Sequence, residues 1–139
     1  MEIRLAGKED LEDYSILKKE FLREYGLPSI TKDFMLDEFK KYLAGAIVLA
    51  IENNELIGYL LGEIESNEYW KVGYISEIFV RDNWRGKSVA TKLKDSFLNF
   101  LKERGIHECK IDVNPDNPAI KAYERWGFSV DKFRMSLKF

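Results

Sequence analysis

The stretch that most constrains the fold runs from Val72 to Gly105 and reads as a strand, a short basic loop and a long helix. Residues 73–80 are mostly aromatic or β-branched, which favours a strand covered on both faces. The loop RDNWRGK follows, and apolar residues then recur at helical spacing, so we expect a helix over about 87–104. The recurring residues are Val89, Leu93, Phe97, Phe100 and Leu101.

The turn between this strand and this helix has the properties of an anion-binding site. Backbone N–H groups at the start of a helix lack partners, and the helix dipole places positive potential there. Arg85 and Lys87 add charge, while Gly86 allows the backbone to approach a ligand closely. Phosphate is the expected ligand, and a solvated basic turn is the alternative. The GKS at 86–88 is not a Walker A loop, because Arg81 stands where that motif needs a glycine.

The composition predicts one globular domain over residues 1–139. Apolar residues make up 45% of the 139, which is enough to form a core without disulfides. A net charge of −2 and a pI near 5.6 give no general affinity for nucleic acid, so we expect none as a partner. The single cysteine, Cys109, and the single histidine, His107, leave no multi-cysteine or histidine-based metal site, and no metal is expected.

The same features predict where the protein works. No apolar run reaches membrane-spanning length, and the first residues lack the apolar region of a signal peptide. A lone cysteine suits a reducing compartment. We therefore expect a cytoplasmic protein that does not associate with a membrane.

The rest of the chain supplies further strands and helices around this centre. Expected strands cover 2–6, 46–52, 56–65, 108–113 and 128–139, the last as one strand or a bent pair. Expected helices cover 11–22, 31–43 and 119–126. Thr31 is the predicted N-cap of the second helix, and Asn53 with Asn54 the predicted hairpin turn.

The order β-α-α-β-β-β-α-β-α-β defines the fold class. Strands that follow one another directly favour antiparallel pairing, whereas the strand-helix-strand crossover between Val72 and Val113 favours a parallel pair. The expected fold is therefore a mixed α/β (α+β) domain. Its central sheet has six to seven strands, with about four helices on its two faces.

Two motifs in this chain resemble those of the GNAT superfamily of N-acetyltransferases. VRDNWRGKSVATKL resembles that family's acetyl-CoA pyrophosphate loop, with Arg85, Ser88 and Ala90 at its three key positions. Ser88 stands where the family has glycine. NPAIKAYERWGF resembles the closing motif, with Tyr123 and a Gly-Phe pair in place. The asparagine of that motif is one residue out of register at Asn117, so Asn114 or Asp116 is the alternative for its role. The predicted order of elements also matches the family over nearly the whole chain.

The resemblance implies transfer of the acetyl group of acetyl-CoA to a primary amine of a small molecule or protein. The amine attacks the thioester directly in a ternary complex, and no metal takes part. Tyr123, protonated at neutral pH, is the implied acid that protonates the departing thiolate, and Glu77 is a candidate base. The residues implied in holding acetyl-CoA are Ile78, Phe79, Val80, Arg85, Gly86, Lys87, Ser88, Val89, Ala90, Asn114, Asn117 and Tyr123.

Each assignment has an alternative that the residues leave open. Tyr123 on a short helix is also a typical half-buried core residue, and Glu77 also fits the solvated side of a strand. The serine at position 88 is compatible with a catalytically weak CoA-binding or protein-interaction module on the same fold. Exposed aromatic residues such as Trp70, or a last strand ending at Phe139, would support a homodimer.

Overall fold

The computed structural model describes residues 1–139 and contains one five-stranded sheet with strands in the order β1-β2-β3-β4-β5. The strands are β1 (Glu2–Leu5), β2 (Ala46–Glu52), β3 (Glu55–Ser66), β4 (Lys71–Val80) and β5 (Cys109–Ile111). The helices are α1 (Leu11–Glu24), α2 (Lys32–Leu43), α3 (Val89–Lys102) and α4 (Ile120–Arg125). Strands β1 to β4 pair antiparallel, and β5 pairs parallel to β4. The mixed fold class and the parallel crossover are confirmed.

Local chemistry sets the ends of two of these elements. The Oγ1 of Thr31 accepts a hydrogen bond of 3.1 Å from the N–H of Phe34, so Thr31 caps α2 as predicted. Asn53 and Asn54 both have positive φ, 52° and 62°, which matches the twist of the β2–β3 hairpin that they connect. Asparagine tolerates this left-handed conformation better than most residues do.

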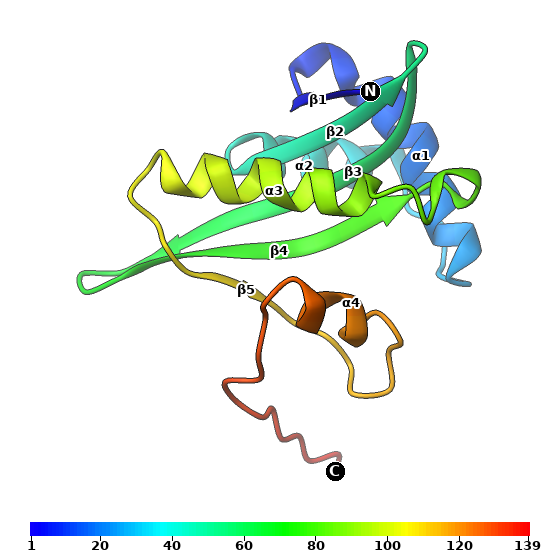
Figure 1. The fold of residues 1–139 in the computed structure, drawn as a ribbon. Coiled ribbons are helices and arrows are strands. Elements are labelled where there is room, and N and C mark those ends of the chain that lie inside the picture. Colours follow the sequence, from blue (N-terminus) through cyan, green and yellow to red (C-terminus); the bar gives the residue numbers. More distant parts are fainter.

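The helices cover both faces of the sheet. Helix α3 lies across one face, and α1 and α2 lie against the other (Figure 1). The apolar side chains of β2 alternate between the two faces, as a strand buried on both sides requires. No helix has the length and apolar composition needed to span a bilayer.

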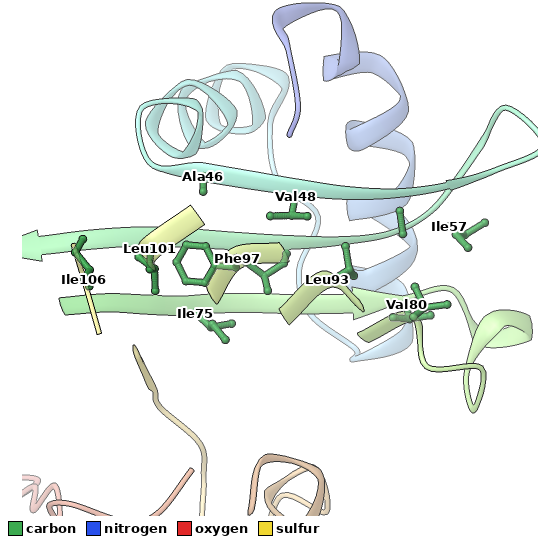
Figure 2. Packing of buried hydrophobic residues seen from close by; sticks show 12 residues of the cluster. Ala46, Val48, Ile57, Ile75, Val80, Leu93, Phe97, Leu101 and Ile106 are labelled. Carbon is green, nitrogen blue, oxygen red and sulfur yellow. The ribbon is translucent and has the colours of Figure 1, made fainter. Parts of the chain in front are cut away.

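The core on the α3 face is formed entirely by apolar side chains. Leu93, Phe97 and Leu101 project from α3 onto the sheet (Figure 2). Helix and sheet approach closely because glycine occupies two strand positions beneath α3. A Cβ on Gly62 would lie 2.4 Å from the Phe97 ring, and one on Gly73 would lie 2.4 Å from a Leu101 methyl group. This close approach fixes α3, and with it the loop that precedes it, relative to β4.

One β-bulge interrupts β4. Its register with β3 passes from Glu77 opposite Leu61 to Ile75 opposite Gly62, so Ser76 is the extra residue. A bulge bends a strand and turns two successive side chains to the same face. Ser76 and Glu77 therefore both point toward the face covered by α1 and α2, where Ser76 contacts Glu63 and Glu77 contacts α1.

The last residues do not form the strand that the sequence predicts. Residues 128–139 have no regular secondary structure, and the sheet has five strands where we expected six to seven. The alternating apolar pattern is present, but this segment has no strand beside it to accept its backbone hydrogen bonds. The chain end instead runs away from the sheet beyond α4 (Figure 1). Four of its apolar side chains are between 72% and 92% exposed. They are Val130, Phe133, Met135 and Leu137.

Candidate active site

The sheet opens between β4 and β5. The two strands pair only where residues 73–75 lie beside residues 109–111, so β5 is shorter than the strand that the sequence predicted over 108–113. From Ser76 onward β4 has β3 on one side only, and β5 turns away from it (Figure 1). Residues 76–80 thus present an edge that faces no neighbouring strand. Ile78 to Val80, which the family resemblance implies in holding acetyl-CoA, lie on this edge.

The predicted phosphate loop carries a run of free donors. The backbone N–H groups of residues 86–91 have no hydrogen-bond acceptor within the chain, and the first α3 bond runs from Lys92 N to Ser88 O at 3.1 Å. Gly86 and Ser88 have positive φ, 75° and 63°. These left-handed turns direct successive N–H groups toward one side of the loop. The loop fits a pyrophosphate in charge, donor number and position at a helix N-terminus.

The two cations of this loop have different surroundings. The guanidinium of Arg85 donates to the Val80 carbonyl at 2.9 Å and pairs with Glu24 of α1, so it ties the loop to β4 and α1. The Glu24 carboxylate raises the pKa of Arg85, and Arg85 lowers the pKa of Glu24. Lys87 is exposed, makes no ion pair and lies 4.8 Å from the centre of the Trp84 ring. Lys87 is therefore the cation of the pair that is free to meet an anion.

Tyr123 lies on α4 with its ring packed against Trp126 and Phe128, at centroid distances of 5.6 and 6.4 Å. Its hydroxyl makes no hydrogen bond within the chain, and the side chain is half-buried. Burial, and to a smaller extent Tyr25, raises the pKa of Tyr123. A phenol with a raised pKa stays protonated over a wider pH range, as a proton donor must.

Of the two asparagine candidates, only one has an unoccupied side chain. The Oδ1 of Asn117 accepts a 2.9 Å hydrogen bond from the N–H of Ala119 and so shapes the turn before α4. The side chain of Asn114 makes no hydrogen bond, while its carbonyl accepts from the N–H of Asn117 at 2.9 Å. The whole amide of Asn114 is thus free to meet a ligand, whereas Asn117 has only its Nδ2 donors free because its Oδ1 is occupied.

Glu77 is neither solvated nor isolated. Both of its carboxylate oxygens accept hydrogen bonds from the ammonium of Lys18, at 3.0 and 2.8 Å, and one of them also accepts from the hydroxyl of Tyr59. The side chain is 19% exposed, at the point where β4 separates from β5. The bulge at Ser76 is the local reason that Glu77 faces α1 here.

This contact belongs to a larger polar network that the sequence analysis missed. Lys18 also pairs with Glu38 of α2 at 3.2 Å, and Glu38 accepts a 2.6 Å hydrogen bond from Tyr14. Burial is the main cause that raises the pKa of Tyr14 and of Tyr59. A signal was present in the sequence, because Lys18 stands four residues after Tyr14 within the apolar stripe of α1. Glu24, the partner of Arg85, had no such signal.

A scan against protein families matches residues 13–128 to the acetyltransferase (GNAT) family. This chain therefore belongs to the GNAT acetyltransferase family. The match includes α1 from Asp13 onward, the opening between β4 and β5, the predicted phosphate loop and Tyr123.

Known proteins agree with this assignment. The chain is 32% identical over 82 residues to N-alpha-acetyltransferase 30 of Schizosaccharomyces pombe, which covers 58% of this chain and 55% of that protein. The chain thus matches about half the length of that relative. It is 29% identical to an uncharacterized N-acetyltransferase of Archaeoglobus fulgidus, over 84% of each chain. The fold matches the aminoglycoside N-acetyltransferase AAC(6')-Iy in complex with CoA, with a TM-score of 0.84, 22% identity, and 99% and 93% of the two chains covered.

Proposed function

We propose that this protein transfers the acetyl group of acetyl-CoA to a primary amine. The observation that carries the proposal is the run of free N–H groups over residues 86–91, beside the open edge of β4. In a GNAT family member these are the two surfaces that a CoA thioester needs. One holds the pyrophosphate, and the other offers backbone groups to the pantetheine arm and the acetyl carbonyl.

The donor would be held mainly by the backbone. The N–H groups of residues 86–91 would donate to the pyrophosphate, with Lys87 as the supporting cation. Arg85 would act mainly by fixing the loop, because its guanidinium already donates to the Val80 carbonyl and pairs with Glu24. Asn114 would add a hydrogen bond to the cofactor arm, whereas Asn117 would support the turn before α4.

Two side chains would handle the protons. Glu77 would accept a proton from the amine as its nitrogen forms a bond to the thioester carbon and the carbon–sulfur bond breaks. Tyr123 would give its hydroxyl proton to the leaving sulfur. The proton on Glu77 would then return through solvent to the Tyr123 phenolate, so that amine and thioester become amide and thiol.

The acceptor class is the least constrained part of the proposal. The S. pombe relative is named as an N-alpha-acetyltransferase and the structural neighbour as an aminoglycoside N-acetyltransferase, so protein N-termini and small cationic amines are both to be tested. Glu38 and Glu77, one on each side of Lys18, give the α1 and α2 side of the opening an excess of negative charge. This favours an acceptor that arrives as its ammonium form and releases one proton to solvent, so that the neutral amine attacks.

Titration calorimetry with acetyl-CoA and CoA tests the donor site. We expect micromolar binding of both, at least tenfold weaker in Lys87→Glu. Lys102→Glu, a matched charge reversal at the far end of α3, should bind as the parent does. If neither compound binds, the phosphate loop is not a cofactor site and the proposal fails.

Free-thiol release with a panel of amines tests the transfer itself. We expect Tyr123→Phe to lower kcat by about a hundredfold, within the usual range for a proton donor, and to leave CoA affinity unchanged. Binding without release from any amine would instead favour the catalytically weak CoA-binding or interaction module. Work in a reducing compartment fits the one thiol, since burial raises the pKa of Cys109 to about 12 and keeps it unreactive.

A homodimer through the chain end is the partner we propose besides the substrates. Phe133, Met135 and Leu137 alternate with polar residues and are almost fully exposed, which is the pattern of a strand without a sheet. The outer edge of β5 is unpaired in each copy. In a dimer, residues 128–139 of each copy would pair with the outer edge of β5 in the other copy. Both the chain end and the β5 edge would then have a strand partner.

Light scattering after gel filtration tests this dimer. Leu137→Glu should halve the mass, whereas Lys138→Glu, on the opposite side of the segment, should leave it unchanged. A parent protein of monomeric mass would contradict the dimer. If the parent is a monomer and Leu137→Glu lowers its melting temperature, residues 128–139 pack against their own chain and not against a second copy.

A further inference from the structure

Lys18 differs from the other buried charged groups of the molecule. The buried charged residues are Asp10, Lys18 and Lys94. Asp10 pairs with Arg4 beside it in the fold, and Lys94 pairs with its own neighbour Asp95, which is exposed. Lys18 alone joins carboxylates from two further elements, Glu38 of α2 and Glu77 of β4, and its side chain is only 5% exposed.

The contacts leave one acceptor position of Glu77 open. An ionised carboxylate offers about four lone-pair positions. Lys18 uses one on each oxygen, and the Tyr59 hydroxyl uses a second one on Oε2. The free position is therefore on Oε1. The side chain is 19% exposed, and Glu77 stands two residues beyond Ile75, where pairing between β4 and β5 ends.

Lys18 is the one cation in contact with Glu77. The groups that face Glu77 are Tyr14 and Lys18 from α1, Glu38 from α2 and Tyr59 from β3. Glu38 carries like charge, and the two phenols are neutral and buried, so Lys18 supplies the only positive charge. Burial and a like-charged neighbour both favour the protonated form of a carboxyl group, which cannot accept a proton from an amine.

We propose that Lys18 is a positioning residue that keeps Glu77 ionised and directs its Oε1 toward the acceptor amine. This inference rests on the proposed acetyl transfer and on Glu77 as its base. It assigns a function to a residue outside both family motifs. Helix α1, which carries Lys18, makes no hydrogen bond to the free N–H groups of residues 86–91 or to Tyr123. Lys18 thereby links α1 and α2 to the chemistry on β4.

The test compares three lysine variants by two readouts. Lys18→Met removes the cation, Lys18→Arg keeps it, and Lys19→Met makes the same change at the exposed next residue of α1. One readout is the pH dependence of kcat/KM for the best amine. The other is the titration of the Glu77 carboxyl carbon by NMR, with its resonance assigned from Glu77→Gln, and this readout needs no activity.

We expect Lys18→Met to move the titration midpoint of Glu77 and the acid limb of the rate profile upward together, by 1 to 2 pH units, which is about what an adjacent opposite charge contributes. On the acid side kcat/KM should then fall about ten- to a hundredfold. Lys18→Arg and Lys19→Met should leave both readouts within about 0.3 pH units of the parent, a small fraction of that effect. If Lys18→Met does not fold, the double variant Lys18→Met with Glu38→Gln is used in its place. This double variant keeps the summed charge of positions 18, 38 and 77 equal to that of the parent.

Two results would overturn the inference. An unmoved Glu77 midpoint in Lys18→Met would show that Lys18 does not control its ionisation, whether or not the protein transfers acetyl groups. A midpoint that moves while the acid limb stays would show that Glu77 is not the base. A parent protein that releases no thiol with any amine, yet shows the expected change in the Glu77 titration, would refute the proposed function and leave the ion pair intact.

Discussion

On the α3 face of the sheet every member of the buried cluster is apolar, whereas the face under α1 and α2 also buries Lys18 and the hydroxyls of Tyr14 and Tyr59. The first face is held mainly by apolar packing, with the one buried charge of α3, Lys94, lying over the Trp126 ring, and its glycines show how closely the layers meet. The second face depends on each polar atom finding its partner, and no buried side-chain polar atom is left without one.

This difference separates stability from chemistry. A buried ion network often contributes less to the free energy of folding than apolar side chains of the same volume would. It does, however, hold charged groups at fixed positions. The face that carries these charges is also the one toward which Glu77 points at the opening of the sheet. Changes on the α3 face should therefore alter stability most, and changes on the opposite face should alter pH dependence most.

The largest effect is expected on the α3 face. Phe97→Ala removes a ring that is fully buried and lies against Gly62, so the free energy of unfolding should fall by about 3 to 5 kcal/mol. Urea denaturation measures this loss. Phe34→Ala, on the exposed side of α2, should change it by less than about 0.5 kcal/mol. Equal losses in the two variants would contradict the packing described for this face.

A smaller effect, specific to the polar face, is expected in alkali. Burial raises the pKa of Tyr14 and Tyr59 above the ordinary value of 10.0, so the unfolded chain releases these protons first as the pH rises. Their contribution to stability is complete below about pH 10. Above it, stability should fall by about 1.4 kcal/mol per pH unit for each tyrosine.

Urea denaturation between pH 9 and 11.5 measures this slope. Tyr59→Phe should reduce the slope of stability against pH by the contribution of one tyrosine, about 1.4 kcal/mol per pH unit. Tyr69→Phe, at an exposed position in the β3–β4 turn, should leave the slope unchanged. An identical slope in Tyr59→Phe and the parent would refute the role of burial in this titration.

The smallest effect is expected where α3 begins. Ser88 holds a left-handed conformation, with φ of 63°, and its side chain makes no capping hydrogen bond. Ser88→Gly should therefore stabilise the protein by about 1 kcal/mol, because glycine adopts this conformation without steric penalty. A thermal melt measures the gain, and calorimetry should show CoA affinity within twofold of the parent. A tenfold weaker affinity would mean that the serine hydroxyl itself contacts the ligand.

Much of this fold could be predicted from the sequence because its patterns are long and regular. The helix expected over 87–104 is α3 at 89–102, and the strands expected over 46–52 and 56–65 are β2 and β3 within one residue. The last strand could not be predicted correctly from alternation alone. A strand also needs a neighbour for its backbone, and residues 128–139 have none.

The place of the candidate site was predictable where it depends on the order of elements. Arg85, Gly86 and Lys87 lie between a strand and a helix as expected, and their role in binding phosphate stays a prediction. The role of Lys18 depends on Glu77 and Glu38, which lie far from it in sequence and meet it only because β4 and α2 pack against α1. No local sequence pattern predicts contacts between residues so far apart in the chain. The only signal was the presence of Lys18 within the apolar stripe of α1.

The bulge at Ser76 has a consequence for how this site could arise or be lost. Because Ser76 and Glu77 face the same side, removal of Ser76 would restore regular alternation and send no core side chain to the wrong face. Pairing between β4 and β5 stops at Ile75, immediately before the extra residue. In terms of the gene, one codon is the difference between a regular β4 and one that bends where the sheet opens, so a single in-frame deletion is the shortest mutational path to a regular strand.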